Sequence, residues 1–203
     1  MGGSLDNLKL EEVCLRADGI DDEVMEALCD RLKTSKVKSL DLSMNSFTSK
    51  AIEFLIEGLR QNMSLEYLGL AGLNMTVNDL KPLLEEFGRF KITPEEALIL
   101  QQKIKERDII LNKNKKAKGK KVEPVPKIPN MIKDDQGNTF IIKNEGFRHL
   151  NIALNEFDES SVEELDRALG RTSAGFTLTI SSKGIPKEAA KALTSKYGGR
   201  VIL

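Results

Sequence analysis

The feature that most constrains the fold is an apolar pattern that recurs at intervals of 27 or 28 residues. Within one copy, Leu40 and Leu42 alternate with polar residues, whereas Ala51, Leu55 and Leu59 recur at every fourth position. Alternation is the period of a β-strand, and a spacing of four residues places side chains on one face of a helix. Each copy is therefore predicted to form a short strand, a turn and a helix.

Five copies of the pattern are present, and one segment interrupts them. We expect a single domain over residues 1–203, with units at residues 10–36, 37–64, 65–88, 147–174 and 175–203 and an insertion at 89–146. One strand is expected in each unit, all parallel, near Glu12–Leu15, Ser39–Leu42, Tyr67–Leu70, His149–Asn151 and Thr177–Ile180. Residues at matching positions of these strands should point the same way.

The turn after each strand contains a position at which asparagine recurs. Asn45 and Asn155 occupy it in the second and fourth units, and Leu73 replaces the asparagine in the third. An amide side chain there can bond backbone groups of the neighbouring unit that the tight turn leaves unpaired. In the first unit, Val24, Leu28 and Leu32 are the residues that match the apolar helix positions.

These units match a known consensus. The pattern LxxLxLxxNxI, followed by a helix, is met by residues 37–47 and 147–157. The chain resembles the intracellular, ribonuclease-inhibitor-like class of leucine-rich repeat proteins. The resemblance implies an α/β fold, a horseshoe-shaped solenoid of five strand–turn–helix repeats with a helical and loop insertion between the third and fourth. It also implies binding of other proteins, as in the ribonuclease inhibitor and the activating protein of the Ran GTPase.

The insertion is predicted to begin with a helix. Thr93 and Glu96 form a capping box around Pro94, and Ala97, with the apolar residues that follow it, lies on one stripe. We expect a helix at 94–112, a loop rich in lysine and proline at 113–130, and a short hairpin or strand at 131–145 that leads back into the sheet.

The lysines of that loop are candidates for contact with an anionic surface. They are Lys113, Lys115, Lys116, Lys118, Lys120 and Lys121. Arginines and aromatic residues, which grip phosphates and stack on bases, are absent among them, so we favour a solvated helix end and linker over nucleic-acid binding. The balance of 31 basic and 31 acidic residues likewise creates no overall field toward an anionic partner.

The cysteines and the apolar runs bear on the cellular location of the protein. The two cysteines, Cys14 and Cys29, lie in the first unit, and the amino-terminal segment lacks the apolar core of a secretory signal. A cytoplasmic location is expected. Apolar runs stay well short of the roughly 20 residues that a membrane-spanning helix needs.

The sequence does not resemble an enzyme. It has one histidine and lacks zinc-spaced cysteines, a phosphate-binding glycine loop and a nucleophile elbow, so we expect no catalytic residue, cofactor or metal. Cys14 and His149 belong to the first and fourth units, too far apart to act as nucleophile and base. The acidic pairs Asp21–Asp22 and Asp158–Glu159 precede repeat helices, where capping explains them better than metal binding.

The strand alternation predicts the partner-binding surface. If Leu40 and Leu42 point toward the helices, the intervening residues form the concave face of the sheet. The predicted binding residues on it are Glu12, Arg16, Ser39, Asp41, Tyr67, His149, Asn151, Thr177 and Thr179. The face is mixed and polar, with Tyr67 as its one large aromatic residue, and Ser43, Gly69 and Ala71 are also expected to point outward there. This composition suits a protein better than a small molecule.

We therefore expect a scaffold or adaptor that binds a partner protein through this face, in a cytoskeletal or ciliary assembly by analogy with related repeats. The alternatives are a regulator of an enzyme such as a small GTPase and, more weakly, an anionic-surface or nucleic-acid binder acting through the lysine-rich loop. Residues 200–203 are expected to open a sixth strand with an apolar edge. Either the natural chain extends further, or this edge pairs with a partner or with a second copy.

Overall fold

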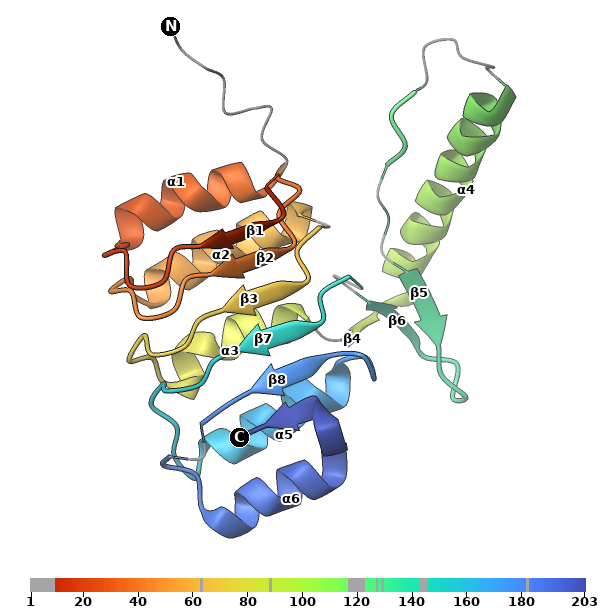
Figure 1. Ribbon diagram of the computed structural model, residues 1–203. Coiled ribbons are helices and arrows are strands. Elements are labelled where there is room, and N and C mark those ends of the chain that lie inside the picture. Colours follow the sequence, from red (N-terminus) through yellow and green to blue (C-terminus); the bar gives the residue numbers. More distant parts are fainter. Residues whose placement is uncertain are drawn as a thin grey trace, which may run out of the picture. The chain divides into compact units, whose positions relative to one another are not determined.

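The computed structural model describes residues 10–62, 64–87, 89–116, 123–126, 128, 130–142, 146–181 and 183–203; the side chains of residues 89–91, 116, 130 and 142 are outside this description. The chain forms two compact units (Figure 1). The parallel unit comprises residues 1–88 and 144–203, and the inserted unit comprises residues 89–143.

In the parallel unit, strands and helices alternate along the chain. The strands are β1 (Glu12–Cys14), β2 (Ser39–Asp41), β3 (Tyr67–Gly69), β7 (His149–Asn151), β8 (Thr177–Thr179) and β9 (Val201–Ile202). The helices are α1 (Asp22–Leu32), α2 (Ser49–Gln61), α3 (Val77–Glu86), α5 (Ser161–Arg171) and α6 (Lys187–Tyr197), followed by a 3-10 turn at Gly198–Arg200. A strand lies at each of the five predicted places, and the expected sixth strand is present as β9.

The strands of this unit form one six-stranded sheet in the order β1-β2-β3-β7-β8-β9. Every pairing in it is parallel. The register aligns Leu40 with Leu68, Leu150 and Leu178, so these residues occupy equivalent positions, as the period predicts. The α/β class is thereby confirmed, with a mostly parallel sheet built from alternating strands and helices.

The helices cover one face of the sheet, and the core lies between the two layers (Figure 1). The aligned leucines and the next inward row, which includes Leu42, Leu70 and Ile152, are at most 2% exposed. On the helix side, Leu55 and Leu165 are fully buried against them. Each strand and the helix that follows it in the parallel unit thus add one apolar layer to a continuous core.

The asparagine turns link neighbouring units through their backbones. The Oδ1 atom of Asn45 accepts from the amide of Ile20 (3.0 Å), and its Nδ2 donates to the carbonyls of Leu15 and Leu42 (both 2.8 Å). Asn155 likewise accepts from the Leu73 amide (3.0 Å) and donates to the Leu70 carbonyl (2.8 Å). The role predicted for these side chains is confirmed.

The two chain segments that flank the insertion meet within the parallel unit. Strand β3 pairs directly with β7, although about 80 residues separate them in sequence. The rings of Phe87 and Phe147 stack with centroids 4.1 Å apart, and Phe176 lies 6.1 Å from both. The core is therefore continuous across the interruption.

The first unit departs from the predicted helix positions. Val24 is 49% exposed and Leu28 is only partly buried, whereas Met25, Cys29 and Leu32 are buried. Asp21 caps α1 by accepting from the Val24 amide (3.0 Å). The residues that follow Val24 and Leu28 are thus buried in their place, whereas Leu32 is buried as predicted.

The inserted unit contains a helix and its own sheet. Strands β4 (Arg89–Ile92), β6 (Thr139–Ile142) and β5 (Asn130–Lys133) pair antiparallel in the order β4-β6-β5, next in sequence to α4 (Pro94–Lys116). The predicted capping box is present, with the Thr93 amide donating to Glu96 (2.7 Å). The helix extends four residues past the predicted end at 112. The hairpin does not lead into the parallel sheet, because β6 pairs with β4, a strand that the sequence patterns did not predict.

Candidate partner-binding face

The register arranges the predicted binding residues in two rows across the parallel sheet. One row contains Glu12, Ser39, Tyr67, His149 and Thr177. The other contains Cys14, Asp41, Gly69, Asn151 and Thr179, and Ile202 of β9 continues it. Arg16 lies two residues beyond β1. These two rows and Arg16 are called the sheet face below.

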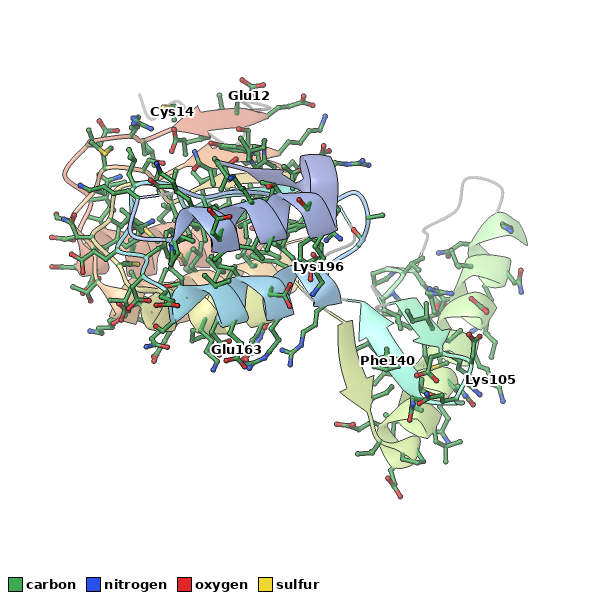
Figure 2. The ribbon with its side chains drawn as sticks, turned by 90° about the horizontal axis from the view of Figure 1, so that it is seen from below. Glu12, Cys14, Lys105, Phe140, Glu163 and Lys196 are labelled. Atoms are coloured by element: carbon green, nitrogen blue, oxygen red, sulfur yellow. The ribbon has the colours of Figure 1, made fainter. Side chains whose placement is uncertain are left out.

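Side chains of the sheet face lie opposite the helices. They alternate along each strand with the buried leucines, and alternate residues of a strand point to opposite sides. In Figure 2, Glu12 and Cys14 extend from β1 on the sheet side of the unit, whereas Glu163 of α5 lies on the helical side. The predicted site residues are thus brought together on one surface.

The middle of the sheet face is organised by His149. Its ring meets the Tyr67 ring edge to face, with centroids 5.1 Å apart and planes at 83°. Its Nε2 lies 2.7 Å from the Thr179 hydroxyl oxygen. Partial burial lowers the pKa of His149, so the neutral ring predominates at neutral pH and presents one donor and one acceptor. Three strands therefore contribute to one ordered aromatic and polar cluster.

A charged pair lies at the edge of the sheet face near β1. Arg16 and Asp41 are 3.9 Å apart, and the Asp41 carboxylate also accepts from the Ser43 amide (3.0 Å). Gly69 makes room for this carboxylate, because a Cβ atom on Gly69 would collide with it. The sequence patterns contained no indication of this role for Gly69, since it depends on the side chain of the neighbouring strand.

Three positions expected to point outward are not available on the surface. Ser43 is fully buried, Ala71 is 3% exposed, and Gly69 is also buried. The hydroxyl of Ser43 accepts from the Ala71 amide (3.0 Å), which fixes both residues between adjacent strand ends. The expectation of an accessible position was wrong for Ser43, Gly69 and Ala71, and the accessible face is narrower than alternation alone predicts.

The cysteines and acidic clusters have identifiable local roles. Burial raises the pKa of Cys29 to about 12, so its thiol stays protonated, while Cys14 is exposed on β1, with β2 and β3 between it and His149. Asp158 accepts from the hydroxyls of Ser160 (2.7 Å) and Ser161 (2.9 Å), and these bonds lower its pKa. Within the described part of the chain, no group of three or more histidine, cysteine or acidic residues is placed to hold a metal ion.

The lysine cluster is only partly described. Lys113 and Lys115 are exposed on the last turns of α4, and the backbone of Lys116 ends this helix. Lys118, Lys120 and Lys121 lie outside the described residues. Among the helices that are described, none combines the length and apolar character required to cross a bilayer.

The last strand forms one edge of the parallel sheet. Val201 is buried against β8, whereas Ile202 and Leu203 are 45% and 51% exposed. Pairing of this edge with a second chain stays a prediction.

No family model matches this sequence, and no curated protein matches it either.

Proposed function

We propose that this protein is a leucine-rich-repeat solenoid that serves as a scaffold or adaptor and binds a partner protein on the sheet face. The observation that carries this proposal is the alignment of the polar and aromatic rows across five parallel strands, on the surface that the helices leave uncovered. The resemblance to leucine-rich repeats adds the proposed setting, a cytoplasmic assembly of the cytoskeleton or cilium.

The central cluster is the proposed anchor for the partner. Tyrosine and arginine are enriched among residues that dominate binding energies, and a partner loses less entropy on a surface that is already ordered. Tyr67 is held by His149, and His149 is held by Thr179. Arg16 lies beside Asp41 and offers a charged contact toward the β1 edge of the sheet face.

Paired affinity captures test the proposal. Wild-type protein, a Tyr67→Ala variant and a Glu163→Ala variant on α5 are each used to retain proteins from a cytosolic extract of the source cells. A protein retained by the wild type and by Glu163→Ala is then purified and titrated by calorimetry. We expect Tyr67→Ala to weaken its binding at least tenfold.

Equal binding by Tyr67→Ala, or loss of binding with Glu163→Ala alone, would place the interface elsewhere and contradict the proposal. If the partner is a GTPase or another enzyme, its turnover with and without this protein distinguishes a regulator from a scaffold. Circular dichroism of each variant verifies that the fold is retained.

A further inference from the structure

A second surface lies beyond the sheet face, in the turns that follow the strands. Ala17, Met44, Gly72 and Leu154 occupy the same position in four successive units, directly before the asparagine position. All four adopt left-handed backbone conformations, with φ between 58° and 65°. Met44 and Leu154 are 48% and 57% exposed. These four residues are called the turn strip.

Local structure does not explain the apolar residues of the turn strip. A left-handed conformation favours glycine or asparagine, because other side chains crowd the backbone there. Elsewhere in the same turns the chain does use such residues, with Gly19 at φ 71° and Asn74 at φ 57°. Neither conformation nor burial favours methionine at 44 or leucine at 154, so their role is sought at the surface.

The strip is continuous across neighbouring units. A Cβ atom on Gly72 would collide with the Met44 sulfur atom and would lie 3.9 Å from the Leu154 Cβ atom. The Met44 side chain therefore lies across Gly72 toward Leu154. A thioether is polarisable and flexible, which suits it to apolar contacts of varied shape.

Acidic residues outnumber basic ones in the segments that contain or adjoin the turn strip. In residues 15–23, 42–50, 70–79, 152–161 and the equivalent 180–189, the basic residues are Arg16, Lys50, Lys183 and Lys187. The acidic residues in the same segments are Asp18, Asp21, Asp22, Glu23, Asp79, Glu156, Asp158, Glu159 and Glu188. Some of them cap helices, as Asp21 does for α1.

Other carboxylates at these turns are free to face a ligand. Asp18 and Glu23 follow Ala17 in sequence, and Glu156 and Glu159 follow Leu154; all four are exposed and have no side-chain partner among the described residues. The local charge around the apolar strip is thus negative, although the whole chain is neutral. A complementary ligand needs positive charge on both sides of an apolar centre.

We propose that the turn strip binds a protein segment that is both apolar and basic. Its apolar side chains contact Met44, Gly72 and Leu154, and its flanking lysines or arginines face the carboxylates of the first and fourth units. This surface consists of turns and does not include the rows of the sheet face, so the inference does not depend on the function proposed above.

A designed peptide tests the chemistry of the strip. The probe is a fluorescent 16-residue peptide of leucine and lysine, compared with one in which glutamate replaces lysine and one in which serine replaces leucine. We expect the leucine–lysine peptide to bind the full-length protein at least tenfold more tightly than either control. Its affinity should fall as salt is added, because the exposed charges are screened.

The decisive variant is Met44→Asn with Leu154→Asn. Asparagine suits the left-handed backbone, so the melting temperature should be unchanged or higher, while the affinity for the leucine–lysine peptide falls at least tenfold. Ile109→Gln changes another exposed apolar residue, on α4, and should have no effect. Glu156→Gln with Glu159→Gln should weaken binding, whereas Glu26→Gln with Glu53→Gln on α1 and α2 should not.

Three results would overturn the inference: unchanged affinity in the double asparagine variant, equal binding of the leucine–glutamate peptide, or no binding of the leucine–lysine peptide to the wild type. Sedimentation of the protein without peptide tests whether a second copy of the chain occupies the strip. Self-association that the asparagine substitutions abolish would show that a second copy covers the strip instead. Tyr67→Ala should leave peptide binding unchanged, which separates failure at this surface from failure of the proposed sheet-face function.

Discussion

The two units of this protein distribute their apolar residues in opposite ways. In the parallel unit, strands β2, β3, β7 and β8 place leucine side chains such as Leu40 and Leu150 in the core, at most 2% exposed. In the described part of the inserted unit, Ala97 is the only buried apolar side chain. Leu98, Ile99 and Ile109 on α4 are more than half exposed. The same residue types therefore have different energetic roles in the two units.

The difference follows from how each unit is built. A repeated strand and helix bury their apolar positions against an identical arrangement on either side, so each layer completes its neighbours. A single helix beside a three-stranded sheet can bury only one stripe of its surface. Substitutions of matched residue types in the two units should expose this contrast, and we order them from the largest expected effect to the smallest.

The largest effect is expected for Leu42→Ala. This side chain is fully buried, and its truncation leaves a cavity that should lower the free energy of unfolding by about 2–5 kcal/mol. Leu98→Ala, at a position 59% exposed on α4, should cost less than about 1 kcal/mol. Urea denaturation followed by circular dichroism measures both, and a loss below about 1 kcal/mol for Leu42→Ala would show that the leucine ladder is not a core.

A matched pair of asparagines should show the next effect. Asn155→Ala removes the partners of buried backbone groups, including those of Leu70 and Leu73, and should cost roughly 3 kcal/mol. Asn114 bonds both backbone groups of Glu123 in the inserted unit, but at an exposed site, so Asn114→Ala should cost less than about 1 kcal/mol. Comparable losses in the same denaturation assay would contradict the assigned difference in burial.

A smaller effect is expected from the single histidine. Burial lowers the pKa of His149, so the unfolded chain takes up its proton at a higher pH than the folded chain. Stability should therefore fall as the pH drops below the ordinary histidine pKa of about 6.5. Melting temperatures of wild type and His149→Gln between pH 7.5 and 5.5 test this, and only the wild type should show this part of the decline. Parallel curves would argue against the burial of His149.

The smallest effect is expected from shortening the inserted unit. Replacing residues 117–126 with a short Gly-Ser spacer removes a lysine- and proline-rich stretch whose composition buries little apolar surface. The described residues within it, 123–126, are exposed. The main thermal transition should stay nearly unchanged in calorimetry, and a drop of several degrees would show that this stretch contributes to the packing of the parallel unit.

Several of these features follow from local sequence patterns. Alternation located the strands, and the turn asparagines identified the side chains that bond the preceding unit, because both effects involve residues close in sequence or at matching positions of neighbouring units. The capping box at Thr93 marked the start of α4 for the same reason. Partner positions on the sheet face could be aligned because a fixed period fixes the register.

Only the tertiary structure decided the features that depend on one particular neighbour. The period gave no means to see that Ser43 is covered by the next strand end, that Gly69 accommodates Asp41, or that β4 pairs with β6 in a separate sheet. The turn strip belongs to this group as well, since Met44 and Leu154 become adjacent only when β3 pairs with β7 across the insertion. The physical reason is that a periodic pattern specifies which way a side chain points, whereas the groups that it meets are set by pairings between distant segments.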